Sequence, residues 1–183
     1  NLKREREKIS IDDSLAYKWP DYPSKAAIIF IHGLGGSPKV TWDSFPQLVM
    51  GTSLGQNFDI FCYGYSSNKF WPASPDADSL INEFSSFCQS ELNQYNSVIL
   101  ISHSLGSVIV NGMLLKNEEL EINSKKYLSH LMITPAFFGG AWWAGFSLSQ
   151  TARQLKTKSS YLIDLHEKWK KSQIKNLIKS YLI

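Results

Sequence analysis

Four runs of apolar residues recur along the chain, separated by longer stretches that mix apolar and polar positions. The runs are rich in β-branched and aromatic residues, a pattern typical of strands buried on both faces. Apolar residues at helical spacing occupy three of the stretches between and after them. This alternation predicts an α/β fold with a mostly parallel sheet flanked by helices. The predicted strands are 26–31, 59–65, 97–102 and 127–134, and the predicted helices are 80–92, 106–115 and 155–170.

The two ends of the chain lie outside this alternation. We expect residues 1–24 to be a lead-in and residues 25–169 to form the core of one domain, since 183 residues suit a single domain. Residues 170–183 combine apolar and lysine positions and predict a packed C-terminal helix. Because the sequence begins at Asn1 and not at methionine, we expect it to be part of a longer protein.

The composition is that of a globular protein and argues against nucleic acid as its partner. Hydrophobic residues make up 43% and charged residues 19% of the chain, and the net charge of +3 is too small to favour nucleic acid. Two scattered cysteines form neither a disulfide framework nor a zinc site, so we expect a reduced, cytoplasmic setting without a metal. The charged N-terminus lacks the apolar run of a signal peptide.

One stretch, residues 128–152, carries no charged residue and is long enough to cross a bilayer. It also contains Pro135 and three glycines, which favour a buried strand followed by a glycine-rich loop over a membrane span.

The third predicted strand ends in Ser102-His103-Ser104-Leu105-Gly106, where a predicted helix begins. This order matches the nucleophile elbow G-x-S-x-G, with Ser102 in place of the first glycine. In such a turn the apical serine has a strained backbone and an exposed hydroxyl, and the residues two before and two after it must be small. We predict that Ser104 is a catalytic nucleophile. A plain strand-to-helix turn capped by a serine is the alternative.

A second motif, His32-Gly33-Leu34-Gly35-Gly36, follows the first predicted strand. A serine hydrolase stabilises its oxyanion with two backbone N–H groups, one after the nucleophile and one in a His-Gly loop. We therefore predict Leu105 and Leu34 as the donors. A dinucleotide-binding loop is disfavoured, because Pro38 stands where the third glycine would be. The residues expected to support the site are His32, Gly33, His103 and Gly106.

At these two motifs the sequence resembles the α/β-hydrolase superfamily. Residues 30–42, FIHGLGGSPKVTW, are similar to a lipase-like branch that includes serine-active-site-containing proteins and GPI inositol-deacylases, and whose domains are also fused to intracellular signalling ATPases. Ile133-Thr134-Pro135 corresponds to a Thr-Pro-His element after the family's sixth strand, with Ala136 in place of the histidine. The resemblance covers about residues 25–169. It implies a serine esterase with a Ser-Asp-His triad in that chain order and no cofactor.

The triad acid and base are not identified in this chain. The family carries both on later strands, whereas this chain is expected to stop after the sixth strand and its helix. His32 belongs to the loop, and the side chain of His103 should point away from that of its neighbour Ser104. His130 is expected at the start of a strand, and His166 and Asp164 on a helix face. Either the native protein extends further, or another chain completes the triad, or the domain is inactive.

Two classes of function follow from these observations. The first is a serine esterase or lipase that acts on a small acyl ester or lipid and contacts a membrane surface peripherally. The second is a catalytically inactive hydrolase-like interaction or effector module of a larger signalling protein, with fused or partner domains. Five aromatic residues of the glycine-rich loop are expected to bind an acyl chain or membrane lipid, with core packing as the alternative: Phe137, Phe138, Trp142, Trp143 and Phe146.

Overall fold

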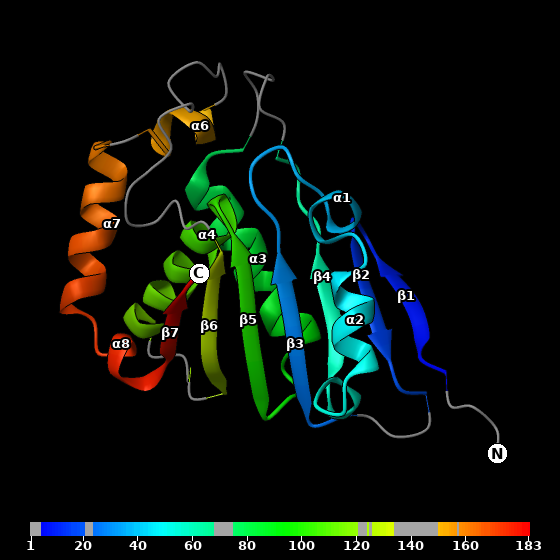
Figure 1. The fold of residues 1–183 in the computed structure, drawn as a ribbon. Coiled ribbons are helices and arrows are strands. Elements are labelled where there is room, and N and C mark those ends of the chain that lie inside the picture. Colours follow the sequence, from blue (N-terminus) through cyan, green and yellow to red (C-terminus); the bar gives the residue numbers. More distant parts are fainter. Residues whose placement is uncertain are drawn as a thin grey trace.

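A seven-stranded sheet forms the centre of the chain in the computed structural model, which describes residues 5–20, 24–67, 75–120, 124, 126–133, 150–156 and 158–183 (Figure 1). Its strand order is β1-β2-β4-β3-β5-β6-β7. The five strands from β4 to β7 in this order run parallel, and β1 and β2 are antiparallel to their neighbours. The strands are β1 (Glu7–Ile11), β2 (Ser14–Lys18), β3 (Ala26–Ile31), β4 (Asp59–Tyr63), β5 (Ser97–His103), β6 (Tyr127–Ile133) and β7 (Lys179–Leu182).

Helices cover both faces of the sheet, as Figure 1 shows for α1 and α2 on one face and α3 and α4 on the other. Residues of β3 alternate between two apolar clusters: Ile29 and Ile31 pack on the α3 and α4 side, and Ile28 and Phe30 pack with Trp42 on the α1 side. The helices are α1 (Pro38–Trp42), α2 (Phe45–Gly51), the 3₁₀ turn η1 (Gly55–Asn57), α3 (Ala77–Glu91), α4 (Leu105–Glu119), α6 (Gln150–Gln154), α7 (Ser160–Lys171) and α8 (Ile174–Leu177). The predicted mostly parallel sheet flanked by helices is confirmed.

The prediction for the ends of the chain is wrong in two places. Residues 1–24 include the β1–β2 hairpin, whose strands have five residues each and whose edge strand β1 is largely exposed. Residues 170–183 hold the end of α7 and the four-residue helix α8, and then β7 extends the sheet beyond β6. The prediction that the sheet ends with the strand 127–133 is therefore wrong. Strand β7 pairs with backbone groups of β6 that would otherwise lie at the edge of the sheet.

The predicted helix 155–170 begins later than its periodicity suggested. Lys158 has a positive φ of 60°, and Ser159 caps α7 by accepting a hydrogen bond from the amide of Leu162. Helix α3 begins at Ala77, within the acidic stretch before the predicted apolar positions, where the carboxylate of Asp76 caps it by accepting a hydrogen bond from the amide of Ser79.

A buried carboxylate ties the outer strands to the middle of the sheet. Asp59, at the start of β4, accepts hydrogen bonds from the hydroxyl of Tyr95 at 2.7 Å and from the amide of Trp19 at 3.3 Å. Arg6 lies across the Trp19 ring at 4.5 Å and donates to the carbonyl oxygen of Gly55 at 2.6 Å. These contacts join the N-terminal hairpin to the start of β4 and to the residues before β5.

We expect Tyr95→Phe to lower the free energy of unfolding by about 1–3 kcal/mol, because it removes a donor from a buried carboxylate. Urea denaturation measures the loss. Tyr161→Phe is the matched control, since that hydroxyl donates to Asp78 at 2.8 Å on the surface and its loss should cost clearly less. Equal losses in the two variants would contradict the role assigned to the Asp59 contact.

Candidate active site

A strained turn joins β5 to α4 and has Ser104 at its apex. Ser104 has φ 51° and ψ −118°, and it is one of four non-glycine residues with positive φ in the described part of the chain. Two neighbours hold this conformation. The Ser104 amide donates to the carbonyl oxygen of Ile133 at the end of β6 (3.1 Å), and the Ser107 hydroxyl donates to the Ser104 carbonyl oxygen (2.7 Å). A side chain in this left-handed region costs about 1–3 kcal/mol, so the surrounding structure must impose it.

Close backbone contacts bring the two sequence motifs together. A Cβ atom at Gly106 would lie 2.5 Å from the carbonyl oxygen of Ile31, at the end of β3. A Cβ atom at Gly33 would lie 2.9 Å from the Cβ of Ser104 and 2.8 Å from Nδ1 of His103. Only glycine fits at either position without a shift of its neighbours. The His-Gly loop and the turn at Ser104 are therefore in direct contact.

Ser102 replaces the first glycine of the elbow pattern and has a buried partner. Its hydroxyl lies 2.6 Å from Nε2 of His130, and both residues are fully buried between the sheet and α4. Burial lowers the pKa of His130 to about 3, so its imidazole is neutral at pH 7. The prediction that His130 starts a strand is wrong. It is the fourth residue of β6 and pairs with Leu100.

The His-Gly loop is fixed by residues that follow β4. The rings of His32 and Tyr65 stack with centroids 4.1 Å apart and planes 4° apart, and the Tyr65 hydroxyl donates to the His32 carbonyl oxygen at 2.7 Å. The amide of Gly35 donates to the carbonyl oxygen of Ser67 at 2.7 Å. Burial lowers the pKa of His32. Sequence reasoning did not single out Tyr65 or Ser67, because their roles arise only from a contact across more than thirty residues.

The two backbone amides predicted as oxyanion donors lie on either side of this contact. Leu34 follows Gly33 in the loop, and Leu105 is the first residue of α4, where an amide has no carbonyl one turn earlier to bond. Within the described ranges neither amide donates a hydrogen bond to another group, whereas Gly35 and Gly36 in the same loop both do. Among the described residues these two N–H groups therefore have no hydrogen-bond acceptor.

None of the four histidines, all of which lie in the described residues, forms a hydrogen bond with Ser104. His32 and His130 are engaged elsewhere, as described above. His103 is half-buried with its pKa lowered by burial, and His166 lies on α7. Asp164, also on α7, forms an exposed ion pair with Lys168 at 3.2 Å. These residues are not assembled into a triad around Ser104.

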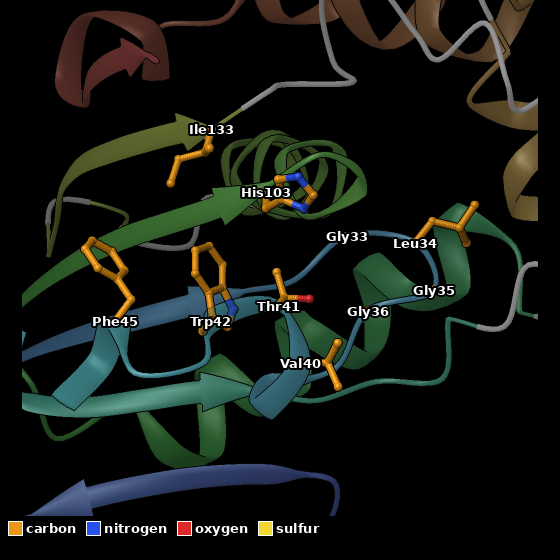
Figure 2. A pocket seen from close by; sticks show the side chains of 10 residues that line it. All are labelled: Gly33, Leu34, Gly35, Gly36, Val40, Thr41, Trp42, Phe45, His103 and Ile133. Atoms are coloured by element: carbon orange, nitrogen blue, oxygen red, sulfur yellow. The ribbon is translucent and has the colours of Figure 1, made fainter. Parts of the chain in front are cut away.

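A cavity of about 550 Å³ opens beside the turn, on the α1 and α2 side of the sheet. Figure 2 shows that its wall includes His103 and Ile133 at the ends of β5 and β6, and Trp42 and Phe45 from α1 and α2. Gly33 also lines it, so the cavity reaches the backbone that touches Ser104. Val40 at its rim is 80% exposed and Trp42 at its wall only 5%. The lining is mainly apolar. Ser104 itself is buried and is not among the lining residues, so its link to the cavity is through Gly33 and His103.

The five aromatic residues of the predicted glycine-rich loop lie outside the described residues: Phe137, Phe138, Trp142, Trp143 and Phe146. Over the part of the chain that the structure describes, no three His, Cys, Asp or Glu side chains are grouped so that they could hold a metal ion.

We expect Gly106→Ala to destabilise the chain by about 1–3 kcal/mol, because the added methyl group would press on the Ile31 carbonyl. Thermal unfolding followed by circular dichroism measures the loss. Gly51→Ala is the control, since a Cβ atom at that position meets nothing within 4 Å. If both variants were as stable as the parent chain, the close approach of α4 to β3 would not be the constraint described here.

No known protein-family model matches the sequence, and no curated protein is significantly similar to it. Solved structures, in contrast, are similar in fold. Phospholipase PlaB from Legionella pneumophila superimposes with a TM-score of 0.69 at 18% identity over 86% of this chain, which spans 38% of the phospholipase. The mature lipase BlEst2 from Bacillus licheniformis gives 0.66 at 16% identity, covering 92% of this chain and 70% of the lipase. The Francisella virulence factor BioJ gives 0.53 at 15% identity, covering 99% of this chain and 75% of BioJ. With the strand order and the flanking helices described above, these similarities show that the chain has the α/β-hydrolase fold.

Proposed function

We propose that the chain carries the nucleophile and oxyanion donors of an ester hydrolase. The observation that supports this most is the positive-φ backbone of Ser104 at a strand-to-helix turn, in contact with a glycine-rich loop. A serine with this backbone strain is expected where the strain serves chemistry. The phospholipase and lipase among the structural neighbours agree with this class of activity.

In the proposed reaction the Ser104 hydroxyl oxygen attacks the ester carbonyl carbon while its proton passes to a base. The carbonyl oxygen becomes an oxyanion that accepts hydrogen bonds from the amides of Leu34 and Leu105, and the N-terminus of the fifteen-residue helix α4 favours the same negative charge. Cleavage of the ester C–O bond releases the alcohol, which takes the proton from the base. Water then attacks the acyl carbon, the bond from that carbon to the Ser104 oxygen breaks, and the carboxylic acid leaves as the serine regains its proton.

The base and acid of the triad are proposed to come from outside these 183 residues, in a longer chain or from a partner. This follows from the placement of the four histidines, none of which contacts Ser104. Without a base a serine hydroxyl is a weak nucleophile, so activity depends on the completing segment.

The apolar cavity beside Ser104 is proposed to hold the acyl chain of the substrate. Its volume of about 550 Å³ lies in the range of small-molecule sites, and its apolar wall suits a hydrocarbon chain better than a polar group. The aromatic residues of 137–146 are proposed to extend this site or to contact lipid. The similarity of residues 30–42 to the GPI inositol-deacylase-like branch favours a lipid ester as the substrate. Among the described residues no helix has the length and apolar character to span a bilayer.

The catalytic proposal predicts that a fluorophosphonate probe labels the full-length native protein on Ser104. Ser104→Ala should abolish labelling, because it removes the attacking oxygen. Ser53→Ala is the control, since Ser53 is exposed and far along the chain from both motifs, and it should leave labelling unchanged. Absence of labelling in the full-length protein would overturn the proposal and favour the inactive interaction module.

The acyl site predicts that Phe45→Ala lowers kcat/KM for an octanoyl ester about tenfold while changing that for an acetyl ester little, because it removes apolar surface from the cavity wall. Leu54→Ala is the matched control, an exposed apolar residue that does not line the cavity. The double variant Trp142→Ala/Trp143→Ala, for which kcat/KM is measured with the same two esters, tests the aromatic loop. Equal loss on both esters would argue against an acyl-binding role for the residue changed.

A further inference from the structure

One polar group in the wall of the apolar cavity has no hydrogen-bond partner. The indole nitrogen of Trp42 is buried, and no group in the described part of the chain accepts a hydrogen bond from it. Trp42 nevertheless lines the cavity, although the residue is only 5% exposed. Because buried polar groups nearly always have a partner, this N–H group indicates that a ligand supplies the acceptor.

The position of the Trp42 ring is fixed by its neighbours. Trp42 is the last residue of α1, whose first turn is capped by the Ser37 hydroxyl. Its ring packs on that of Phe30 in β3, with centroids 5.1 Å apart. Figure 2 shows the ring nitrogen on the edge turned toward Thr41, another lining residue, and away from Phe45. The N–H group is therefore held in one orientation at the wall of the cavity.

The chemistry of the wall limits what can bind this N–H group. An indole nitrogen donates one hydrogen bond and accepts none, so its partner must be an acceptor. The ten described residues that line the cavity include no Lys, Arg, Asp or Glu, and burial lowers the pKa of His103, which favours its neutral form. A carboxylate would thus be buried without a counter-charge, which is costly. The fitting acceptor is a neutral oxygen.

A second polar atom of the same wall also lacks a partner among the described residues, Nδ1 of His103. Whether this nitrogen donates or accepts depends on the tautomer, so it sets no requirement of its own. The remaining wall is mainly apolar, with Phe45 and Ile133 among its residues. Such a wall favours a ligand that is mostly hydrocarbon and carries a single polar group.

We propose that the acyl chain held in this cavity carries a neutral oxygen substituent, such as a hydroxyl group, that accepts a hydrogen bond from the indole N–H of Trp42. A plain hydrocarbon chain leaves this buried donor unpaired, whereas the substituted chain satisfies it. Trp42 thus selects oxygen-substituted acyl groups, while Phe45 contacts the hydrocarbon part. This inference rests on the acyl site proposed above and names the class of substrate for that site.

Isothermal titration calorimetry of the full-length native protein tests the proposal with octanamide, which lacks an ester bond, and with hydroxyoctanamides that carry the hydroxyl group at different carbons. We expect the best hydroxyoctanamide to bind about fivefold or more tightly than octanamide. Trp42→Phe should abolish this preference, because phenylalanine keeps an aromatic ring beside Phe30 but has no N–H group. Trp19→Phe is the matched control and should keep the preference, since the Trp19 indole lies outside the cavity and already donates to the carbonyl oxygen of Gln56 at 3.0 Å.

A second measurement observes the hydrogen bond directly and does not depend on a variant. In proton–nitrogen correlation spectra of the parent protein, the sequentially assigned indole signal of Trp42 should move downfield with the best hydroxyoctanamide and clearly less with octanamide. Circular dichroism checks that each variant is folded.

The proposal is overturned if no hydroxyoctanamide binds more tightly than octanamide, if folded Trp42→Phe keeps the preference, or if the Trp42 signal responds equally to both ligands. These measurements need no turnover. Failure of a fluorophosphonate to label Ser104 would therefore count against the proposed hydrolase activity and leave the binding preference to be read separately.

Discussion

The contact between the start of α4 and the end of β3 is the constraint on which the rest of this structure depends. Because Gly106 lacks a side chain, the helix approaches the carbonyl oxygens of Ile31 and His32 closely enough to press the turn at Ser104 into a positive φ. Gly33 likewise lies against Ser104, since a Cβ atom there would be 2.9 Å from the Cβ of Ser104. A larger residue at either glycine would separate the two motifs and relax the turn.

Much of the interior could be predicted from the sequence, because its elements are long and their periodicity is strong. Strands β3 to β6 and helices α3 and α4 lie where continuous apolar runs and helical spacing placed them. The short strands at both ends were missed for a physical reason. Strand β7 has four residues, all of them exposed, and its existence depends on pairing with β6 rather than on local composition. The N-terminal hairpin was hidden by its charged residues, although Ile9 and Ile11 alternate with polar neighbours.

At the candidate site, too, features encoded by adjacent residues could be predicted, whereas contacts between residues far apart in the sequence could not. The turn at Ser104 and the His-Gly loop are local motifs and were recognised as such. The supports behind them are not local. Tyr65 stacks on His32 from the segment after β4, and His130 on β6 contacts Ser102 on the neighbouring strand β5. The hydroxyl of Ser102, where a glycine is usual, is satisfied by a neutral histidine in the core, so the departure from the motif is accompanied by a compensating partner.

Helix α4 buries twelve of its fifteen residues, which makes it the central helix of the molecule. We expect the amide protons of such a segment to be among the most slowly exchanging, because core helices open at free energies close to that of global unfolding. The short helices α1 and α2, with Val40 and Leu48 largely exposed, can open locally at much lower cost. Ser104 thus stands at the start of the most deeply buried helix, whereas the apolar cavity near it is walled in part by the short helices α1 and α2.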